Sequence, residues 1–470
     1  MRSLELSGDE MRRMVDEAMR RIVAHIESLP AMPASDVEGG VELARSIAEP
    51  MPQAGRPYDE LLALLFDRLV PKSFNTAGPG YLAYIPGGGL FHSAVADLIA
   101  DSVNRYVGVF QAAPGLAQIE ANVVRWFCEI VGYPAGSGGF LTTGGSLANF
   151  SAIVTARCER LPENFLAGTL YTSDQTHHSV QKAAALAGFP MANIREIPVD
   201  DRLRVRVDLM REAIASDRKS GLTPFLISGN AGTTNTGAVD DLTALADLAR
   251  DEGLWLHVDG AYGGFFALTS RGRAEMAGLD RADSITLDPH KGLFLPYGTG
   301  SLLVRDAATL RRTHSHHAAY LPVMQKESGL VDFCEISPEL SRDFRGLRVW
   351  LPFKMHGAGV FRRALDEKLD LARWAAAQLR LIPGIEVLAE PQLSLVAFRL
   401  FGRDADLDAA NEINGRLLDR INARKRVFLT ATTIGGRFTL RICVLSFRTH
   451  EDRMREGLND IRDAVADVTA

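Results

Sequence analysis

The segment Leu254-Trp255-Leu256-His257-Val258-Asp259 is an apolar run that ends in a carboxylate, and Pro289-His290-Lys291 follows it in the chain. Lys291 lies 291 − 259 = 32 residues after Asp259. A carboxylate at the end of an apolar run is costly to bury without a cationic partner. That partner can be an arginine or a protonated pyridine ring, and a lysine can form a Schiff base with an aldehyde. The pattern therefore predicts a site for pyridoxal phosphate (PLP), whose protonated ring accepts electrons when a bond to the substrate α-carbon breaks.

Short apolar runs separated by helical patterns extend from this segment in both directions. Most runs lack strict alternation of polar and apolar residues, which is typical of strands covered on both faces. The predicted strands are Gly139–Leu141, Thr169–Ser173, Ile194–Pro198, Pro224–Ser228, Leu254–Val258, Ser284–Leu287 and Gly300–Val304. The helices between them include Gly115–Val131, Ala148–Glu159, Val180–Ala187 and Leu242–Glu252. This alternation indicates an α/β protein with a mostly parallel seven-stranded sheet.

The chain changes character after residue 345. A helical stretch over Arg348–Leu381 precedes strand-like runs at Ile385–Ala389, Leu393–Leu400, Val427–Ala431 and Phe438–Leu445. These predict a small C-terminal α+β domain over 346–470. We expect a large domain over 76–345 and a helical N-terminal segment over 1–75.

Ser7-Gly8-Asp9-Glu10 has the pattern of a capping box that opens a helix. The apolar residues of this helix form one stripe, consisting of Met11, Val15, Ala18, Ile22 and Ile26. An amphipathic helix must bury such a stripe on some other surface. The pattern alone leaves open whether that surface belongs to the same chain or to a second copy.

The composition is that of a globular protein, with 46% hydrophobic residues and a formal net charge of −6 without a long basic block. It disfavours a nucleic-acid partner. No run of about 18 apolar residues suggests a membrane span, and residues 1–30 lack the apolar region of a signal peptide. The four cysteines (Cys128, Cys158, Cys334 and Cys443) lie far apart, as in a reduced cytoplasmic protein.

Polar motifs follow three of the predicted strands, at the strand ends where open α/β sheets bind ligands. The backbone amides and hydroxyls of Thr143-Gly144-Gly145-Ser146-Leu147-Ala148-Asn149 suit a phosphate group. In Asp174-Gln175-Thr176-His177-His178-Ser179, an imidazole can stack on a flat ring and hydrogen bond a carboxylate. Gly232-Thr233-Thr234 brings threonine hydroxyls to the same edge. Each motif alone is more often structural, but their combination with Lys291 favours the PLP site.

His314, His316 and His317 form a small histidine cluster beside Arg311 and Arg312. Histidines at this spacing can bind a metal, but no cysteine and few carboxylates accompany them. We therefore expect no metal site and interpret the cluster as a polar loop or interface.

The motifs GGSxAN, DQxHxS, GTT, HVDxAYGG and DPHK occur in this order, and together they resemble the group II PLP-dependent decarboxylases, which include aromatic-L-amino-acid decarboxylase. The resemblance extends to Gly80–Pro86, Arg342–Trp350 and Leu440–Thr449, and thus covers about residues 70 to 460. It implies the PLP fold type I of aspartate aminotransferase. It also implies a homodimer with shared active sites, in which the segment 1–75 packs on the partner.

The resemblance assigns catalytic and ring-binding roles by position. Lys291 would carry PLP, and Asp259 would pair with the pyridine nitrogen. His177 would stack on one face of the ring, and Ala261 would pack under the other. Thr234 would contact the edge of the ring.

It also assigns the phosphate-binding positions, which fall on Ser146, Leu147 and His290. Asp288 lies beside them, where the family often has asparagine. A carboxylate near a phosphate is unfavourable unless it is solvated or paired, so the role of Asp288 stays open.

One position departs from the family pattern. A loop here spanning about Leu321–Leu340 carries a tyrosine in the family, which is thought to protonate the substrate α-carbon after CO2 leaves. Counting back from Arg342-Asp343-Phe344 places Phe333 at that position, and phenylalanine cannot donate a proton. In relatives, loss of this hydroxyl is associated with oxidation that gives an aldehyde, ammonia and peroxide. His177 or water is an alternative proton donor, and a shifted alignment would bring in Tyr320.

Tyr81, Tyr84 and Pro86 belong to the segment that resembles the family's substrate pocket, and Tyr106 and Phe110 can add aromatic surface. They favour an aromatic amino acid as substrate. An acidic substrate is disfavoured, because no arginine is placed to meet a side-chain carboxylate.

The leading prediction is decarboxylation of an L-amino acid to the amine and CO2. The residue at position 333 motivates an aldehyde-forming oxidative deaminase as the alternative, and other PLP lyases share much of the core. A catalytically silent PLP-binding protein is disfavoured, because all the cofactor residues used by the family are present.

Overall fold

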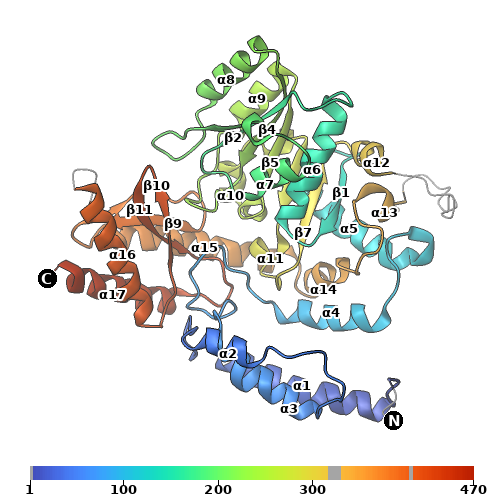
Figure 1. Ribbon diagram of the computed structural model, residues 1–470, viewed down its shortest axis with the longest axis vertical. Helices are drawn as coiled ribbons and strands as arrows, with labels where there is room; N and C mark the ends of the chain where they lie inside the picture. Colours follow the sequence, from blue (N-terminus) through green and yellow to red (C-terminus); the bar gives the residue numbers. More distant parts are fainter. Residues whose placement is uncertain (1–3, 316–329, 402–405, 470) are drawn as a thin grey trace.

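The computed structural model describes residues 4–315, 330–401 and 406–469. A large sheet with its helices forms the main body, a smaller sheet with two long helices lies beside it, and the N-terminal helices extend along one side (Figure 1).

The large sheet has seven strands in the order β1-β7-β6-β5-β4-β2-β3. The strands are β1 (Gly138–Thr142), β2 (Gly168–Ser173), β3 (Ile194–Ile197), β4 (Thr223–Asn230), β5 (Trp255–Gly260), β6 (Ser284–Leu287) and β7 (Gly300–Val304). β2 to β6 pair in parallel, whereas β7 runs antiparallel to β1 and β6. Every residue of β2 and β5 is buried, which explains why these runs do not alternate. The predicted mostly parallel seven-stranded sheet is confirmed.

Helices connect these strands and cover the sheet. They include α5 (Pro114–Val131), α6 (Gly145–Arg160), α7 (Ser179–Leu186), α8 (Val207–Lys219), α9 (Leu242–Glu252), α10 (Ser270–Glu275), α11 (Pro289–Gly292), α12 (Ala308–His314) and α13 (Phe333–Ile336). Short 3-10 turns occur at Phe110–Ala112, Met191–Asn193, Gly264–Leu268 and Leu279–Arg281. Local sequence fixes the ends of α9: the Asp241 side chain accepts from the Ala244 amide, and Gly253 ends the helix with φ 69°.

The smaller sheet is antiparallel, in the order β10-β11-β9-β8. It consists of β8 (Ile385–Val387), β9 (Leu395–Leu400), β10 (Thr430–Ile434) and β11 (Arg437–Cys443), packed with α16 (Leu407–Ala423) and α17 (Glu451–Thr469). This agrees with the predicted C-terminal α+β character.

The helical stretch predicted over Arg348–Leu381 is divided into two helices. The segment forms α14 (Gly346–His356) and α15 (Ala358–Leu379), and the chain turns between them at Gly357, whose φ is 70°. A positive φ is easy for glycine and breaks the helix there. α14 packs against α4 (Phe91–Val103) and α5, next to the large sheet.

The N-terminal segment contains α1 (Gly8–Ser28), α2 (Gly40–Ser46), α3 (Tyr58–Ala63), a π-helical turn at Leu64–Leu69 and a 3-10 turn at Val70–Lys72. The predicted capping box is present, since Ser7 and Glu10 bond reciprocally. None of the residues of α1 is buried.

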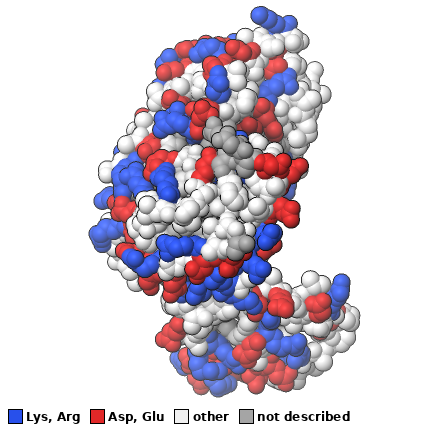
Figure 2. All heavy atoms as spheres, turned by 90° about the vertical axis from the view of Figure 1, so that its left-hand side faces the viewer, with Lys and Arg blue, Asp and Glu red and all other residues white. Residues whose placement is uncertain are grey.

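Acidic and basic side chains are interspersed over the face seen in Figure 2. Among the described residues, no helix is both long enough and apolar enough to cross a bilayer.

Candidate active site

A cavity of about 270 Å³ lies at the carboxyl ends of β2, β4, β5 and β6. The structure brings together in its lining every residue assigned to PLP by the sequence: Ser146, Leu147, His177, Thr234, Asp259, Ala261, His290 and Lys291. The parallel strands explain this convergence, because their carboxyl ends meet at one edge of the sheet.

The Asp259 carboxylate ends β5 and is held at both oxygens. Oδ1 accepts from the Ala261 amide at 3.0 Å, and Oδ2 accepts from Asn149 Nδ2 at 3.0 Å. Only 7% of Asp259 is exposed, and it faces the cavity. A fixed, shielded carboxylate of this kind can hold a proton on a ring nitrogen of a bound ligand.

Asn149 is the centre of the hydrogen-bond network behind the cavity. Its Nδ2 also donates to Ser179 Oγ at 3.0 Å, while its Oδ1 accepts from Thr286 Oγ1 at 2.7 Å and from His257 Nε2 at 3.0 Å. Because the Asp259 carboxylate only accepts, the Asn149 amide has one orientation. Asn149 belongs to the Thr143–Asn149 motif, but no role for it follows from the sequence pattern; the only local signal is a polar residue among small side chains.

His257 supports Asn149 from the core. Its Nδ1 lies 2.9 Å from Ser284 Oγ, which accepts from Trp255 Nε1 at 2.8 Å. Burial lowers the pKa of His257 to about 4, against the opposing effect of Asp259. The imidazole is therefore neutral at pH 7 and donates through Nε2 to Asn149 Oδ1.

His177 follows β2 and lines the cavity. Its Nδ1 lies 2.8 Å from Ser179 Oγ and accepts from the Ser179 amide at 3.3 Å, so the hydrogen is on Nε2. Burial lowers the pKa of His177 despite the charge of Asp259. A neutral imidazole with a free Nε2–H suits stacking on a flat ring and donation to a carboxylate.

Lys291 lies in α11, with its Nζ 2.9 Å from Asp288 Oδ2. Burial disfavours the ammonium, but the charges of Asp288 and Asp259 outweigh it and raise the pKa of Lys291. Schiff-base formation needs a neutral amine. In the protein alone, the carboxylates keep the amine protonated. Asp288, whose role the sequence left open, is thus the ion-pair partner of Lys291.

The turn between β1 and α6, residues 142–147, is the expected phosphate cup. Thr142 Oγ1 donates to the Gly144 carbonyl and accepts from the Gly144 amide. The amides of Leu147 and Ala148 already bond the Gly144 carbonyl, which leaves the amides of Gly145 and Ser146 at the start of α6 for an anion. A Cβ on Gly145 would lie 3.1 Å from Asp288 Oδ2 and 3.2 Å from the Cβ of Ala261, so the lack of a side chain keeps the cup open.

Four predicted residues are not part of this lining. Tyr81 is 3% exposed and packs on Phe428, Tyr84 is half exposed, and Pro86 is buried elsewhere. Phe333 lies in α13 with 1% exposure.

The predicted loop position Tyr320 lies outside the described residues, as do His316 and His317 of the histidine cluster.

The residues present fit PLP. The cavity combines a lysine amine, a fixed carboxylate, an imidazole and a cup of backbone amides. When bound, PLP supplies an electron-accepting ring conjugated to the substrate nitrogen.

Comparison with known proteins agrees with this geometry. The family model described as pyridoxal-dependent decarboxylase conserved domain matches residues 42–401. An aromatic-L-amino-acid decarboxylase of Bacillus atrophaeus is 36% identical over 469 residues, which is 99% of this chain and 98% of that protein.

Two solved structures superpose over nearly the whole chain. Oryza sativa TDC with PLP and tryptamine has a TM-score of 0.93 at 27% identity and covers 100% of both chains. Rhodiola rosea 4-hydroxyphenylacetaldehyde synthase has a TM-score of 0.91 at 23% identity, covering 99% of this chain and 100% of that one, which shows a shared fold. The expected PLP fold type I and the PLP cofactor are confirmed. The chain belongs to the pyridoxal-dependent decarboxylase family and is a PLP-dependent carboxy-lyase.

Proposed function

We propose that this protein decarboxylates an aromatic L-amino acid and releases the amine and CO2. The observation that carries the proposal is the single cavity that holds Lys291, Asp259 and His177 beside a phosphate cup. Decarboxylation needs these groups together, because the electron pair of the broken bond must move into a protonated ring.

Each side chain has a defined task in this proposal. Lys291 Nζ would hold the cofactor aldehyde covalently, and Asp259, fixed by Asn149, would keep a proton on the ring nitrogen. The imidazole of His177 would pack against the ring, and its Nε2–H would be available to hold the substrate carboxylate or to move a proton at the substrate α-carbon.

The aromatic substrate class is supported by two relatives. The Bacillus atrophaeus relative is named aromatic-L-amino-acid decarboxylase, and a relative from Oryza sativa subsp. japonica, 29% identical over 489 residues, is named tryptophan decarboxylase 1. We propose that Tyr81, Tyr84 and Pro86 line the substrate side-chain pocket in the assembled enzyme.

We further propose that the enzyme is a homodimer with shared active sites. α1 buries none of its residues, and it forms an apolar groove with α4 that is lined by Met14, Val15, Ile22, Phe91 and Leu98, among others. An exposed apolar groove of this kind is typical of a protein–protein contact. Sedimentation should give a dimer for the wild type, and Val15→Glu should give monomers. A monomeric wild type would disprove this assembly.

Position 333 motivates the second candidate function, an aldehyde-forming oxidative deaminase. In that reaction O2 and water are consumed, and aldehyde, CO2, ammonia and peroxide are released. A phenylalanine lacks the hydroxyl that would return a proton to the α-carbon. Protonation is then slower, and O2 can react with the decarboxylated substrate before it is protonated. The shared fold does not separate the two outcomes.

One assay tests both candidates. The purified enzyme is given each of the aromatic amino acids and an acidic control, and CO2, amine, aldehyde and peroxide are measured. Amine and CO2 in equal amounts support the decarboxylase. Aldehyde with peroxide supports the alternative, and Phe333→Tyr should then shift the product towards amine. No CO2 from any amino acid would refute both candidates.

A further inference from the structure

β1 leads into the phosphate cup, and it is one of the two edge strands of the large sheet. One side of β1 pairs with β7, with Leu141 opposite Ser301. On the other side, a strand at a sheet edge leaves amides and carbonyls that need partners when they are buried.

Charged side chains provide these partners at Leu141. Its amide donates to Glu120 Oε1 at 3.3 Å, and its carbonyl accepts from Arg342 Nη2 at 2.8 Å and from Arg345 Nη1 at 3.3 Å. The Glu120 and Arg342 side chains thus take the place of the missing neighbouring strand. Leu141 is followed directly by Thr142, which shapes the cup.

The ion pair itself is fully buried. Arg342 Nη2 lies 2.7 Å from Glu120 Oε1, and both side chains have 0% exposure. Glu120 Oε2 and Arg342 Nε and Nη1 lack hydrogen-bond partners within the described part of the chain. Buried ion pairs with unsatisfied atoms are commonly no more stable than apolar side chains of the same size. Stability alone is therefore a poor reason for this pair.

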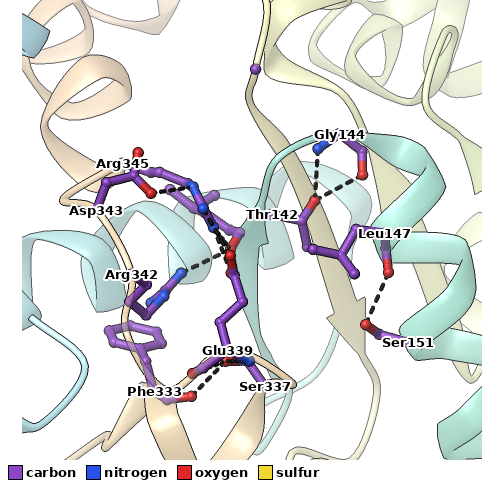
Figure 3. A network of polar contacts seen from close by, with 12 residues as sticks. Thr142, Gly144, Leu147, Ser151, Phe333, Ser337, Glu339, Arg342, Asp343 and Arg345 are labelled. Carbon is purple, nitrogen blue, oxygen red and sulfur yellow. Dashed lines mark hydrogen bonds and ion pairs between the residues drawn. The ribbon is translucent and has the colours of Figure 1, made fainter. Parts of the chain in front are cut away.

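The same guanidinium also contacts Phe333. Arg342 Cζ lies 4.7 Å from the centre of the Phe333 ring, and Arg345 binds Glu339 at 2.6 Å and 2.9 Å. In Figure 3, Arg342 and Arg345 lie on the same side of the view as Phe333, and Thr142 and Gly144 lie across from them. Phe333 also belongs to the apolar cluster that includes Ala148 of α6, the helix that begins at the cup.

We propose that Arg342, with Glu120, is a positioning residue that fixes the cup at the end of β1 and the Phe333 segment at the same time. The proposal rests on the proposed function only in that the cup holds the PLP phosphate. It implies that cofactor affinity and the docking of residues 331–337 are coupled, and such coupling is reciprocal.

The test separates positioning from stability. The double variant Glu120→Leu/Arg342→Met replaces the pair with apolar side chains but also leaves the Leu141 amide without its acceptor, so the unfolding midpoint of the full-length apoenzyme in urea is measured beside each Kd. We expect its Kd for PLP, measured by fluorescence titration, to rise by about 10- to 100-fold, since small displacements of a binding group have effects of this size. If the double variant is less stable than the wild type, the Kd and the unfolding midpoint of Arg342→Lys are measured as well. This variant keeps the positive charge but loses the planar guanidinium that can bond two acceptors at once.

Hydrogen exchange supplies the second readout. In the wild type, PLP should slow amide exchange in peptides covering both 141–147 and 331–337, and in the double variant this effect at 331–337 should be lost. The control is Arg311→Gln, which breaks the ion pair of Arg311 with Glu335 on the outer side of the same segment and should leave the Kd unchanged.

A Kd within twofold of the wild type in both Arg342 variants would overturn the inference, as would PLP protection confined to 141–147. Either failure leaves the proposed function untouched, because that is tested by products. Conversely, a wild type that binds PLP and releases no CO2 refutes the proposed function and still allows the Kd comparison.

Discussion

Substitution of Asn149 tests the central feature of the site, which is that Asp259 is held by a network from the core. Asn149→Ala removes the four hydrogen bonds that join Asn149 to Asp259, Ser179, His257 and Thr286. Asn149 is 1% exposed, so its former partners stay buried.

The expected cost follows from the types of bond. Three of the bonds join neutral groups and contribute about 1 kcal/mol each, whereas the bond to the Asp259 carboxylate contributes about 2 kcal/mol. The four bonds together contribute roughly 5 kcal/mol. Water that enters from the adjoining cavity can bond the former partners of Asn149 and recover about half of this contribution. We therefore expect the free energy of unfolding of the apoenzyme to fall by about 2 to 3 kcal/mol. The bond to Asp259 bears directly on the cofactor, so the Kd for PLP should rise by about 10- to 100-fold.

Urea unfolding and fluorescence titration with PLP measure the two effects. Asn122→Ala is the matched control, because Asn122 is a half-buried asparagine of α5, outside the cavity lining, with hydrogen bonds to Gln118 and Arg125. It should change neither the Kd nor the stability by more than about 0.5 kcal/mol. A Kd for Asn149→Ala within twofold of the wild type would show that Asp259 needs no support from this network.

Three further predictions follow from the same geometry. Asp288→Asn removes the negative charge that most opposes the effect of burial on Lys291, so the pKa of Lys291 should fall. The apoenzyme should then bind PLP covalently at lower pH, which is measured by reducing the Schiff base with borohydride across a pH series. An unchanged pH profile would contradict this prediction. The folded-state pKa of His257 lies near 4, below the ordinary 6.5, so protonation favours the unfolded chain and stability is lost as pH falls from 6.5 towards 4. Urea titrations should show a loss over this range that is roughly 3 kcal/mol larger in the wild type than in His257→Gln. Gly145→Ala places a Cβ 3.1 Å from Asp288 Oδ2 and should raise the Kd for PLP roughly tenfold. An unaltered Kd would show that the cup can accommodate the added methyl group.

The elements that the sequence predicted well are those whose pattern is local. Buried strands are short apolar runs in the sequence, and this pattern predicted the strand Leu254–Val258. In the structure, β5 occupies Trp255–Gly260. The helix over Leu242–Glu252 carries its own cap and its own terminal glycine, and the structure gives the same bounds. The break at Gly357 within the helical stretch Arg348–Leu381 was not predicted, because helix propensity is high on both sides of this residue and one glycine is tolerated in many helices.

The residues that we expect to bind the ligand could be picked out from the sequence itself, since motifs at strand ends must meet wherever parallel strands lie in one sheet. Their electrostatic state was decided only by the tertiary structure. The pairing of Lys291 with Asp288 and the support of Asp259 by Asn149 join residues on different elements, and no local pattern encodes such contacts. The same holds for Phe333, which the chain places in a loop-like segment and the fold buries beneath Arg342. Hydrogen bonds and ion pairs depend on distances of a few tenths of an ångström, and only the packed chain sets those distances.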